Sequence, residues 1–129
     1  MKTPTTFQEL FDTVASHLLH QGKQAMVVDD HTGRPVCEYR TSSGLQCAIG
    51  CLMPDEHYDK MMEGMAASEL SSVSDWFYDL VINLDAGGKS IETALDDLQD
   101  IHDEKAPATW PYHLQKYAKR FGLTYKGYL

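Results

Sequence analysis

Three cysteines and a histidine in the middle of the chain are the residues best suited to chemistry. They are Cys37, Cys47, Cys51 and His57. The spacing of Cys47 and Cys51 occurs among zinc ligands, and Cys37, His57 or Asp55 could complete such a site. Four residues of an extended strand span about 13 Å, so only a turned or helical segment would bring both sulfurs to one ion. Free cysteines are among the most often buried residues, and we expect these three to pack in the fold rather than bind metal.

A thiol-dependent enzyme is the second kind of chemistry that these residues could support. A nucleophilic thiol needs a neighbouring histidine or positive charge that lowers its pKa, and His57 or Arg40 could supply it. Three further histidines, His17, His20 and His102, could converge on a metal, but no H-E-x-x-H pair is present. The glycine-rich loops and nucleophile elbow of phosphate, dinucleotide or ester chemistry are also missing. The sequence therefore predicts no cofactor and leans against an enzyme.

Acidic residues recur at helical spacing between positions 92 and 104. The stripe consists of Glu92, Asp96, Asp100 and Asp103, with Asp97 and Glu104 beside it. Like charges four residues apart destabilise a helix by roughly a few tenths of a kcal/mol, which lysines would avoid. Apolar residues claim the opposite side of this helix, so we expect the carboxylates to face solvent together. The stripe is a candidate docking face for a basic partner, or a mimic of nucleic-acid phosphates. Alternatively, it is a solvated face that keeps the protein soluble.

Length and composition indicate one globular domain over residues 1–129. The chain is 43% hydrophobic and 23% charged, and a chain of this length can form a core without disulfides or metal. Its formal net charge of −8 argues against direct binding to nucleic acid or to a membrane surface, because both are polyanions. Composition thus favours a protein partner with a basic surface, and leaves the oligomeric state open.

The apolar stretches of the chain are short. The N-terminal residues lack the apolar segment of a signal peptide, and the runs at 25–28 and 47–53 fall far below the roughly 20 residues that cross a bilayer. Three cysteines cannot all pair within one chain. We therefore expect a cytoplasmic protein with free thiols.

Apolar residues at helical spacing predict the elements that position these groups. Helices are expected at about 7–21, 76–84, 91–101 and 111–121, with a further one at 55–63 after Pro54. Thr6 with Glu9, and Ser90, are expected N-caps, while Gly22 and Gly122 are expected to end helices. The expected core includes Phe11, Val14, Leu18, Leu80, Leu95, Leu98 and Phe121.

An antiparallel hairpin is expected between helices. Residues 36–40 alternate apolar and polar side chains, and the turn-forming residues 41–44 lead into the segment 45–49. Residues 25–28 form a further extended segment, and the tail 123–129 either docks as a strand or frays. The fold class is therefore α+β, a mainly helical single domain with four or five helices and a small antiparallel hairpin.

The middle of the chain resembles a group of small, functionally unassigned proteins encoded by bacteriophages and prophages. The residues that carry the resemblance are Cys37, Tyr39, Arg40, Gly44, Cys47, Ala48, Ile49, Gly50, Leu52, Pro54, Asp55, Tyr58, Glu63, Gly64, Leu98, Gln99, His102 and Asp103. The resemblance implies a biological setting, the cytoplasm of an infected or lysogenic bacterium, where many small acidic proteins bind host or defence machinery. It implies no mechanism.

These observations lead to two hypotheses about function. The first is an accessory protein that binds and modulates a bacterial host or defence protein. Its contacts would be the acidic stripe, including Asp97, and the segment 37–58 with Arg40, Asp55 and Tyr58. The alternative is a small metal- or thiol-dependent enzyme centred on Cys37, Cys47, Cys51 and His57.

Overall fold

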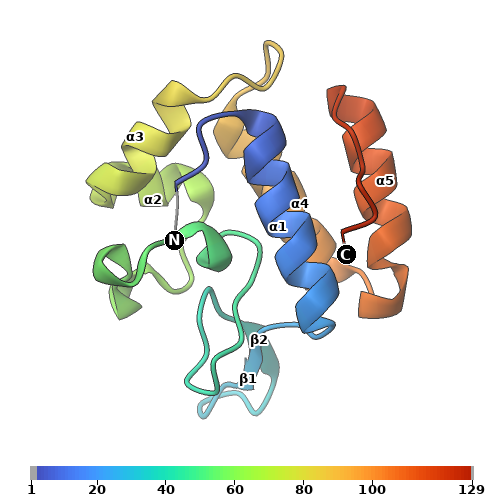
Figure 1. Ribbon diagram of the computed structural model, residues 1–129. Coiled ribbons are helices and arrows are strands. Elements are labelled where there is room, and N and C mark those ends of the chain that lie inside the picture. The colour runs from blue at the N-terminus through green and yellow to red at the C-terminus, as the bar shows by residue number, and fades with distance from the viewer. Residues whose placement is uncertain (1–2, 129) are drawn as a thin grey trace.

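A computed structural model describes residues 3–128, which form five α-helices and a two-stranded antiparallel sheet (Figure 1). The helices are α1 (Phe7–Gln21), α2 (Ala67–Val73), α3 (Asp75–Asn83), α4 (Ile91–Glu104) and α5 (Trp110–Phe121). The strands are β1 (Met26–Val28) and β2 (Pro35–Cys37). This is the mainly helical α+β fold that the sequence predicts. Within the described part of the chain, every helix is too short or too polar to cross a membrane.

Helix ends follow the expected local signals. The Thr6 hydroxyl accepts the Glu9 N–H at 3.1 Å at the start of α1, and the Ser90 hydroxyl accepts the Thr93 N–H at 3.0 Å at the start of α4. Gly22 ends α1 with φ 66°, a left-handed conformation that glycine adopts without steric cost. The short helix α2 is an addition to the prediction, because it buries only Ala67 and Leu70 and so leaves almost no apolar periodicity.

The predicted hairpin is wrong in its pairing. Strand β1 pairs with β2, with Val27 opposite Val36, whereas the predicted partners of residues 36–40 meet only at an isolated bridge between Arg40 and Gln46. The chain after Gln46 turns inward because Cys47, Ile49 and Leu52 are all buried, and strand alternation would place some of them in solvent. The turn at residues 41–44 does form, with the Gly44 N–H bonded to the Thr41 carbonyl.

The predicted helix over residues 55–63 is also wrong. Two separate 3₁₀ turns, Asp55–His57 and Lys60–Met62, take its place, and Tyr58 between them is extended. The Tyr58 hydroxyl donates to the Glu63 carboxylate at 2.5 Å. That carboxylate also accepts the backbone N–H of Tyr39 at 2.7 Å. The bond from Tyr39, 24 positions away, needs Glu63 to fold back onto residue 39, and a continuous helix over 55–63 would prevent this.

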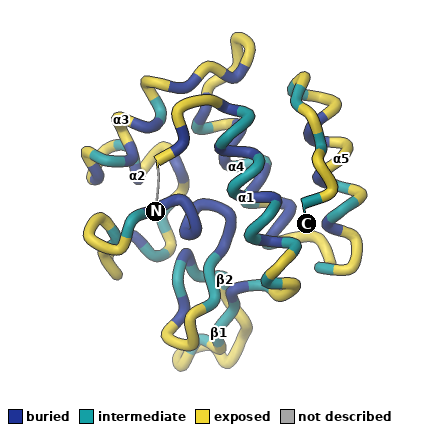
Figure 2. Tube along the Cα trace, in the orientation of Figure 1, coloured by how far each residue is buried: buried dark blue, intermediate teal, exposed yellow. Residues whose placement is uncertain are grey.

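One hydrophobic core joins all five helices and the loop 47–53 (Figure 2). Helix α1 runs through the middle of the molecule, with α4 and α5 on one side and the hairpin beyond its C-terminal end (Figure 1). Six of the seven expected core residues are buried. The exception is Phe121, which is half-buried at the end of α5 and packs edge-on against Phe7.

Candidate functional site

The predicted group of three cysteines and His57 is not assembled. Cys47 and Cys51 are buried, whereas His57 is exposed and stacks on Trp76 at a centroid distance of 6.1 Å. The Cys47 sulfur accepts the Gly50 N–H at 3.3 Å, and the Cys51 thiol donates to the Ala48 carbonyl at 3.1 Å. Burial raises the pKa of Cys47 to about 12 and also raises that of Cys51. These two thiols therefore stay protonated and pack, as expected, inside the turn that they help to form.

The predicted binding residue Arg40 lies at the centre of the middle segment and already has partners. Its guanidinium donates to the carbonyl of Met53, pairs with Asp55 at 2.6 Å and lies 5.1 Å from the centre of the Tyr58 ring. The Arg40 side chain is 14% exposed, whereas that of Asp55 is 94% exposed. Arg40, Asp55 and Tyr58 are thus brought together, and Arg40 holds the segment 50–58 in shape.

The backbone of Tyr39 passes so close to residue 50 that only glycine fits there. A Cβ on Gly50 would lie 1.9 Å from the carbonyl oxygen of Tyr39, which no other residue could tolerate without a backbone shift. Several of the residues that carry the sequence resemblance therefore have structural contacts in this crossing of residues 39–40 over 50–63.

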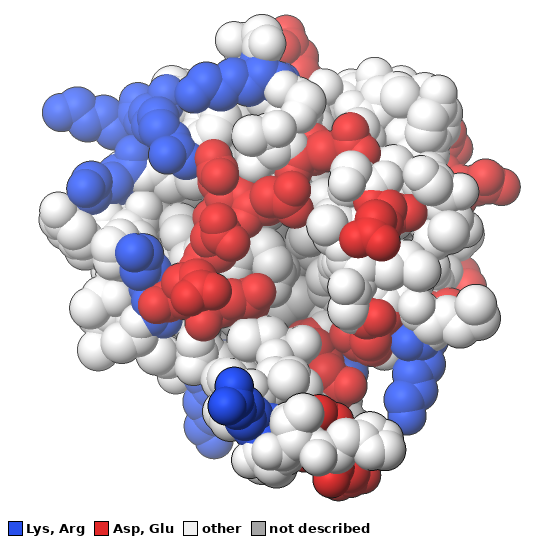
Figure 3. Space-filling model, turned by 180° about the vertical axis from the view of Figure 1, so that it is seen from behind, with Lys and Arg blue, Asp and Glu red and all other residues white. Residues whose placement is uncertain are grey.

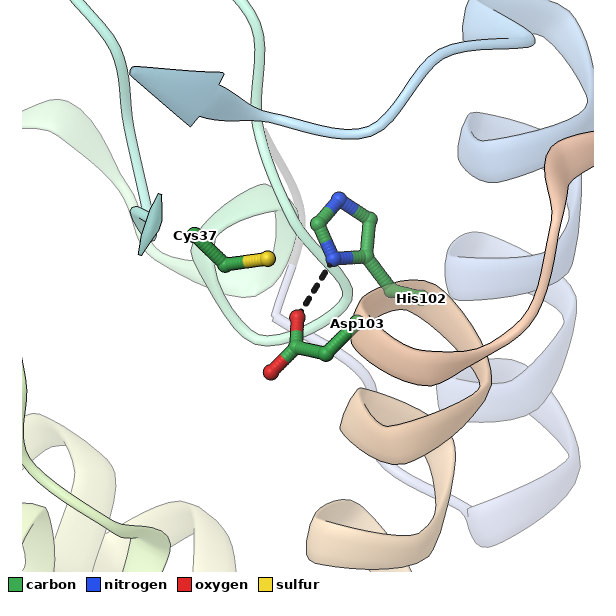
Figure 4. Close-up of side chains that lie close together, drawn as sticks. All are labelled: Cys37, His102 and Asp103. Atoms are coloured by element: carbon green, nitrogen blue, oxygen red, sulfur yellow. Dashed lines mark hydrogen bonds and ion pairs between the residues drawn. The ribbon is translucent and has the colours of Figure 1, made fainter. Parts of the chain in front are cut away.

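A different cluster, which sequence reasoning did not assemble, joins the hairpin to α4 (Figure 4). Cys37, His102 and Asp103 place one ligand atom each within 4.8 Å of one another. His102 Nδ1 lies 2.7 Å from Asp103 Oδ1, and the Ala25 N–H donates to His102 Nε2 at 2.8 Å. The only sequence signal for this cluster is that Cys37, His102 and Asp103 all belong to the residues that carry the resemblance.

The hydrogen bonds of His102 fix its tautomer. Because Nε2 accepts the Ala25 N–H, the proton of a neutral ring is on Nδ1, where it is donated to Asp103. A metal ion at Nδ1 would need that lone pair and would move the proton to Nε2, directly against the Ala25 N–H. The cluster therefore fits a structural lock between β1 and α4 better than a metal site.

The chemistry of Cys37 agrees with that interpretation. Burial, together with the neighbouring carboxylates of Asp103 and Glu104, raises the pKa of Cys37 to about 12. An activated nucleophile needs the opposite shift. The Cys37 sulfur instead lies within 4.8 Å of an Asp103 carboxylate oxygen. The side-chain amide of Gln24 strengthens the same junction by donating to the carbonyls of His102 and Asp103.

An acidic cleft of about 470 Å³ opens beside this lock, between α4 and the segments 37–39 and 63–66. Its carboxylates are Glu38, Glu63, Asp96, Asp100 and Asp103. Among the residues that the structure describes, no lysine, arginine or histidine lines it. The cleft therefore unites two features that the sequence treats separately, the middle segment and the acidic stripe.

The expectation that the stripe faces solvent as one patch holds only in part, because its side chains share one face of α4 but most of them are half-buried. Asp100 is exposed, but Glu92, Asp96, Asp97 and Asp103 are half-buried. Helix α2 packs on one side of the stripe, where the Ser71 hydroxyl donates to Glu92 at 2.7 Å. On the other side Arg120 of α5 pairs with Asp97 at 2.9 Å. The stripe thus lies in the floor and walls of a concave surface, which helical periodicity alone does not reveal.

Several of these carboxylates destabilise one another. Burial raises the pKa of Asp100, and the charges of Asp97 and Asp103 raise it further. Burial also raises the pKa of Asp96, although the Ala67 N–H acts in the opposite direction. Figure 3 shows acidic side chains in a diagonal band across this face, with a group of basic side chains at the upper left and others towards the lower edge. A cation placed in the cleft would relieve this repulsion.

Comparison of the chain with protein-family models, curated proteins and solved structures finds no match. The geometry of the site therefore carries the functional argument.

Proposed function

We propose that this protein is a small acidic accessory protein of phage or prophage type that binds and modulates a bacterial host or defence protein in the bacterial cytoplasm. Its contact surface would be the acidic cleft, extended by Asp97 and Glu92 along α4. The observation that carries the proposal is the set of five carboxylates in one cleft whose lining, over residues 3–128, includes no basic side chain. Arg40, Asp55 and Tyr58 would support this surface by holding the middle segment in place.

The chemistry of the cleft favours a lysine or arginine side chain of a protein partner. A guanidinium group can donate to two carboxylates at once. Burial and neighbouring carboxylates raise the pKa values of Asp96 and Asp100, so a cation bound beside them would relieve the cost of their ionised forms. A net charge of −8 would also accelerate association with a basic surface, with a strong dependence on salt.

The spacing of charge along α4 supports a nucleic-acid-like face. Six carboxylates lie between Glu92 and Glu104, a distance of about 18 Å at 1.5 Å per residue. Charge therefore recurs roughly every 3.6 Å of the helix axis, close to the 3.4 Å per phosphate along one DNA strand. A protein that binds nucleic acid through a basic groove is the kind of partner that this face fits.

The alternative, a metal- or thiol-dependent enzyme, has less support. Cys47 and Cys51 are buried and protonated, and His57 lies apart from them. Cys37 has a raised pKa and a histidine neighbour whose two ring nitrogens are both occupied.

The test compares two pairs of neutralising substitutions that remove the same charge. Asp96→Asn with Asp100→Asn changes the cleft, whereas Asp79→Asn with Glu56→Gln changes exposed positions on α3 and the 55–57 turn. Partners are captured from bacterial lysate and identified by mass spectrometry, and association rates with each purified partner are measured at low and moderate salt. We expect the cleft pair to slow association at least tenfold and the control pair to have a small effect. Equal effects of the two pairs would reduce the cleft to a general source of negative charge.

A further inference from the structure

The C-terminal tail, residues 123–128, runs beside α1 without regular secondary structure, turns at Gly127 and Tyr128 (φ 72° and 44°), and is held by side chains. Gln8 pairs with the backbone of Thr124 in both directions, since its amide nitrogen donates to the Thr124 carbonyl and its oxygen accepts the Thr124 N–H, each at 2.9 Å. Such two-point pairing recognises an extended backbone regardless of its side chain. The contact joins residues 116 positions apart, so it is a docking contact rather than a local turn.

Asp12, one helical turn after Gln8, binds two side chains of the same tail. Its carboxylate pairs with the Lys126 ammonium at 2.9 Å and accepts the Tyr128 hydroxyl at 2.7 Å. Burial raises the pKa of Asp12, but hydrogen bonds from Lys126, Tyr128 and Gln8 outweigh burial, so that the pKa is lowered overall. The tail therefore places the Lys126 ammonium beside the half-buried Asp12 carboxylate of α1.

An aromatic surface lies under the end of the tail. The Tyr128 ring packs edge-on against Phe11 at 5.9 Å, and Phe11 in turn stacks on Tyr117 of α5 at 5.6 Å. Thr124, Lys126 and Gly127 are nevertheless exposed, whereas Leu123, Tyr125 and Tyr128 are half-buried. The tail thus contributes surface contacts at the edge of the core, and helix α5 ends before it at Gly122.

We propose that the α1–α5 face is a peptide-docking groove that takes a segment with a lysine and a tyrosine two residues apart and a turn at the glycine between them, and that the C-terminal tail occupies it as a displaceable strap. Gln8 recognises the backbone of the segment, Asp12 its lysine and tyrosine, and Phe11 the tyrosine ring. In the intact protein the tail competes from within the chain, at an effective concentration on the order of millimolar. A segment of the same pattern from another molecule binds when the tail is released. This groove is separate from the acidic cleft and does not depend on its function.

The test uses the full chain with its tail undocked by Lys126→Glu and Tyr128→Ala, which place a negative charge beside Asp12 and remove the aromatic contact. The probe is a fluorescein-labelled peptide of residues 122–128, and binding is measured by fluorescence anisotropy. We expect the double variant to bind the peptide at least tenfold more tightly than the native chain. Adding Asp12→Asn should weaken that binding about tenfold, as loss of a charged hydrogen-bond partner does. Adding Asp79→Asn on the exposed face of α3 should leave it unchanged.

Equal binding of the peptide to the native chain and to the folded double variant would overturn the proposal, as would indifference to Asp12→Asn. Loss of helical circular dichroism in the double variant would show that the tail is an integral part of the fold, with the same consequence. Hydrogen exchange in the native chain gives a second measurement. The Thr124 amide should exchange by local opening at least 100-fold faster than the Leu98 amide in the core, and equal protection of the two amides would refute a displaceable strap.

Discussion

Replacing His102 with leucine should destabilise the fold strongly without abolishing a catalytic or metal function. The ring is fully buried, and Leu fills much of its volume while removing both hydrogen bonds. The buried Ala25 N–H then loses its acceptor, which costs about 1–3 kcal/mol. Asp103 keeps its bond from Gln99 at 2.8 Å, so its lost donor adds only about 1 kcal/mol. Loss of the stack on Trp110, at a centroid distance of 5.7 Å, adds about 0.5–1 kcal/mol.

The expected loss is therefore about 2.5–5 kcal/mol in the free energy of unfolding, measured by urea denaturation followed by circular dichroism. A typical domain is stabilised by roughly 5–15 kcal/mol. The variant should therefore remain folded at low temperature, but with a much smaller free energy of unfolding. The control is His20→Leu on the exposed side of α1, which should change stability by less than about 0.5 kcal/mol. A loss below about 1 kcal/mol for His102→Leu would refute the structural lock. Stoichiometric zinc in the purified native protein, or unfolding by a chelator, would also refute it.

Two further predictions concern the middle segment and the acidic cleft. Gly50→Ala should cost about 3 kcal/mol or more, because the added Cβ meets the Tyr39 carbonyl oxygen, and urea denaturation would show it; a loss below about 1 kcal/mol would mean that residues 39 and 50 separate easily. Asp100→Asn should raise the melting temperature at pH 7 and low salt. The pKa of Asp100 is raised in the fold, so its ionised form destabilises the protein above the pKa and this penalty disappears as pH falls below the ordinary aspartate value. The gain should therefore vanish near pH 3, and a gain that persists there would point to a cause other than charge.

Local signals in the sequence predict much of the helical framework. Thr6 and Ser90 cap helices at the expected places, because a cap hydroxyl and its target N–H lie within three residues of each other. The apolar stripes of α1, α4 and α5 likewise follow from the 3.6-residue period of one helix. These features need no information about the rest of the chain.

The errors arise where distant residues decide the outcome. Glu63 accepts the backbone N–H groups of Tyr39 and Arg40, and this pairing across more than twenty positions replaces the expected helix by two short turns. The periodicity of α4 correctly identifies which side is apolar, but it does not say that α2 and α5 flank the polar side. The acidic stripe therefore becomes part of a cleft rather than an exposed patch.

Asp103 belongs both to the structural lock and to the acidic cleft. Its hydrogen bonds within the lock affect how strongly it can bind a cation that enters the cleft. Its Oδ1 accepts from both His102 and Gln99, and its side chain is 29% exposed. A carboxylate that is already held by two donors has less to gain from an incoming cation than one without donors. Asp100 is exposed and has no such donors among the described residues. A basic side chain entering the cleft should therefore bind mainly to Asp100, Asp96 and Glu38, while Asp103 adds negative potential and keeps the hairpin wall of the cleft fixed to α4.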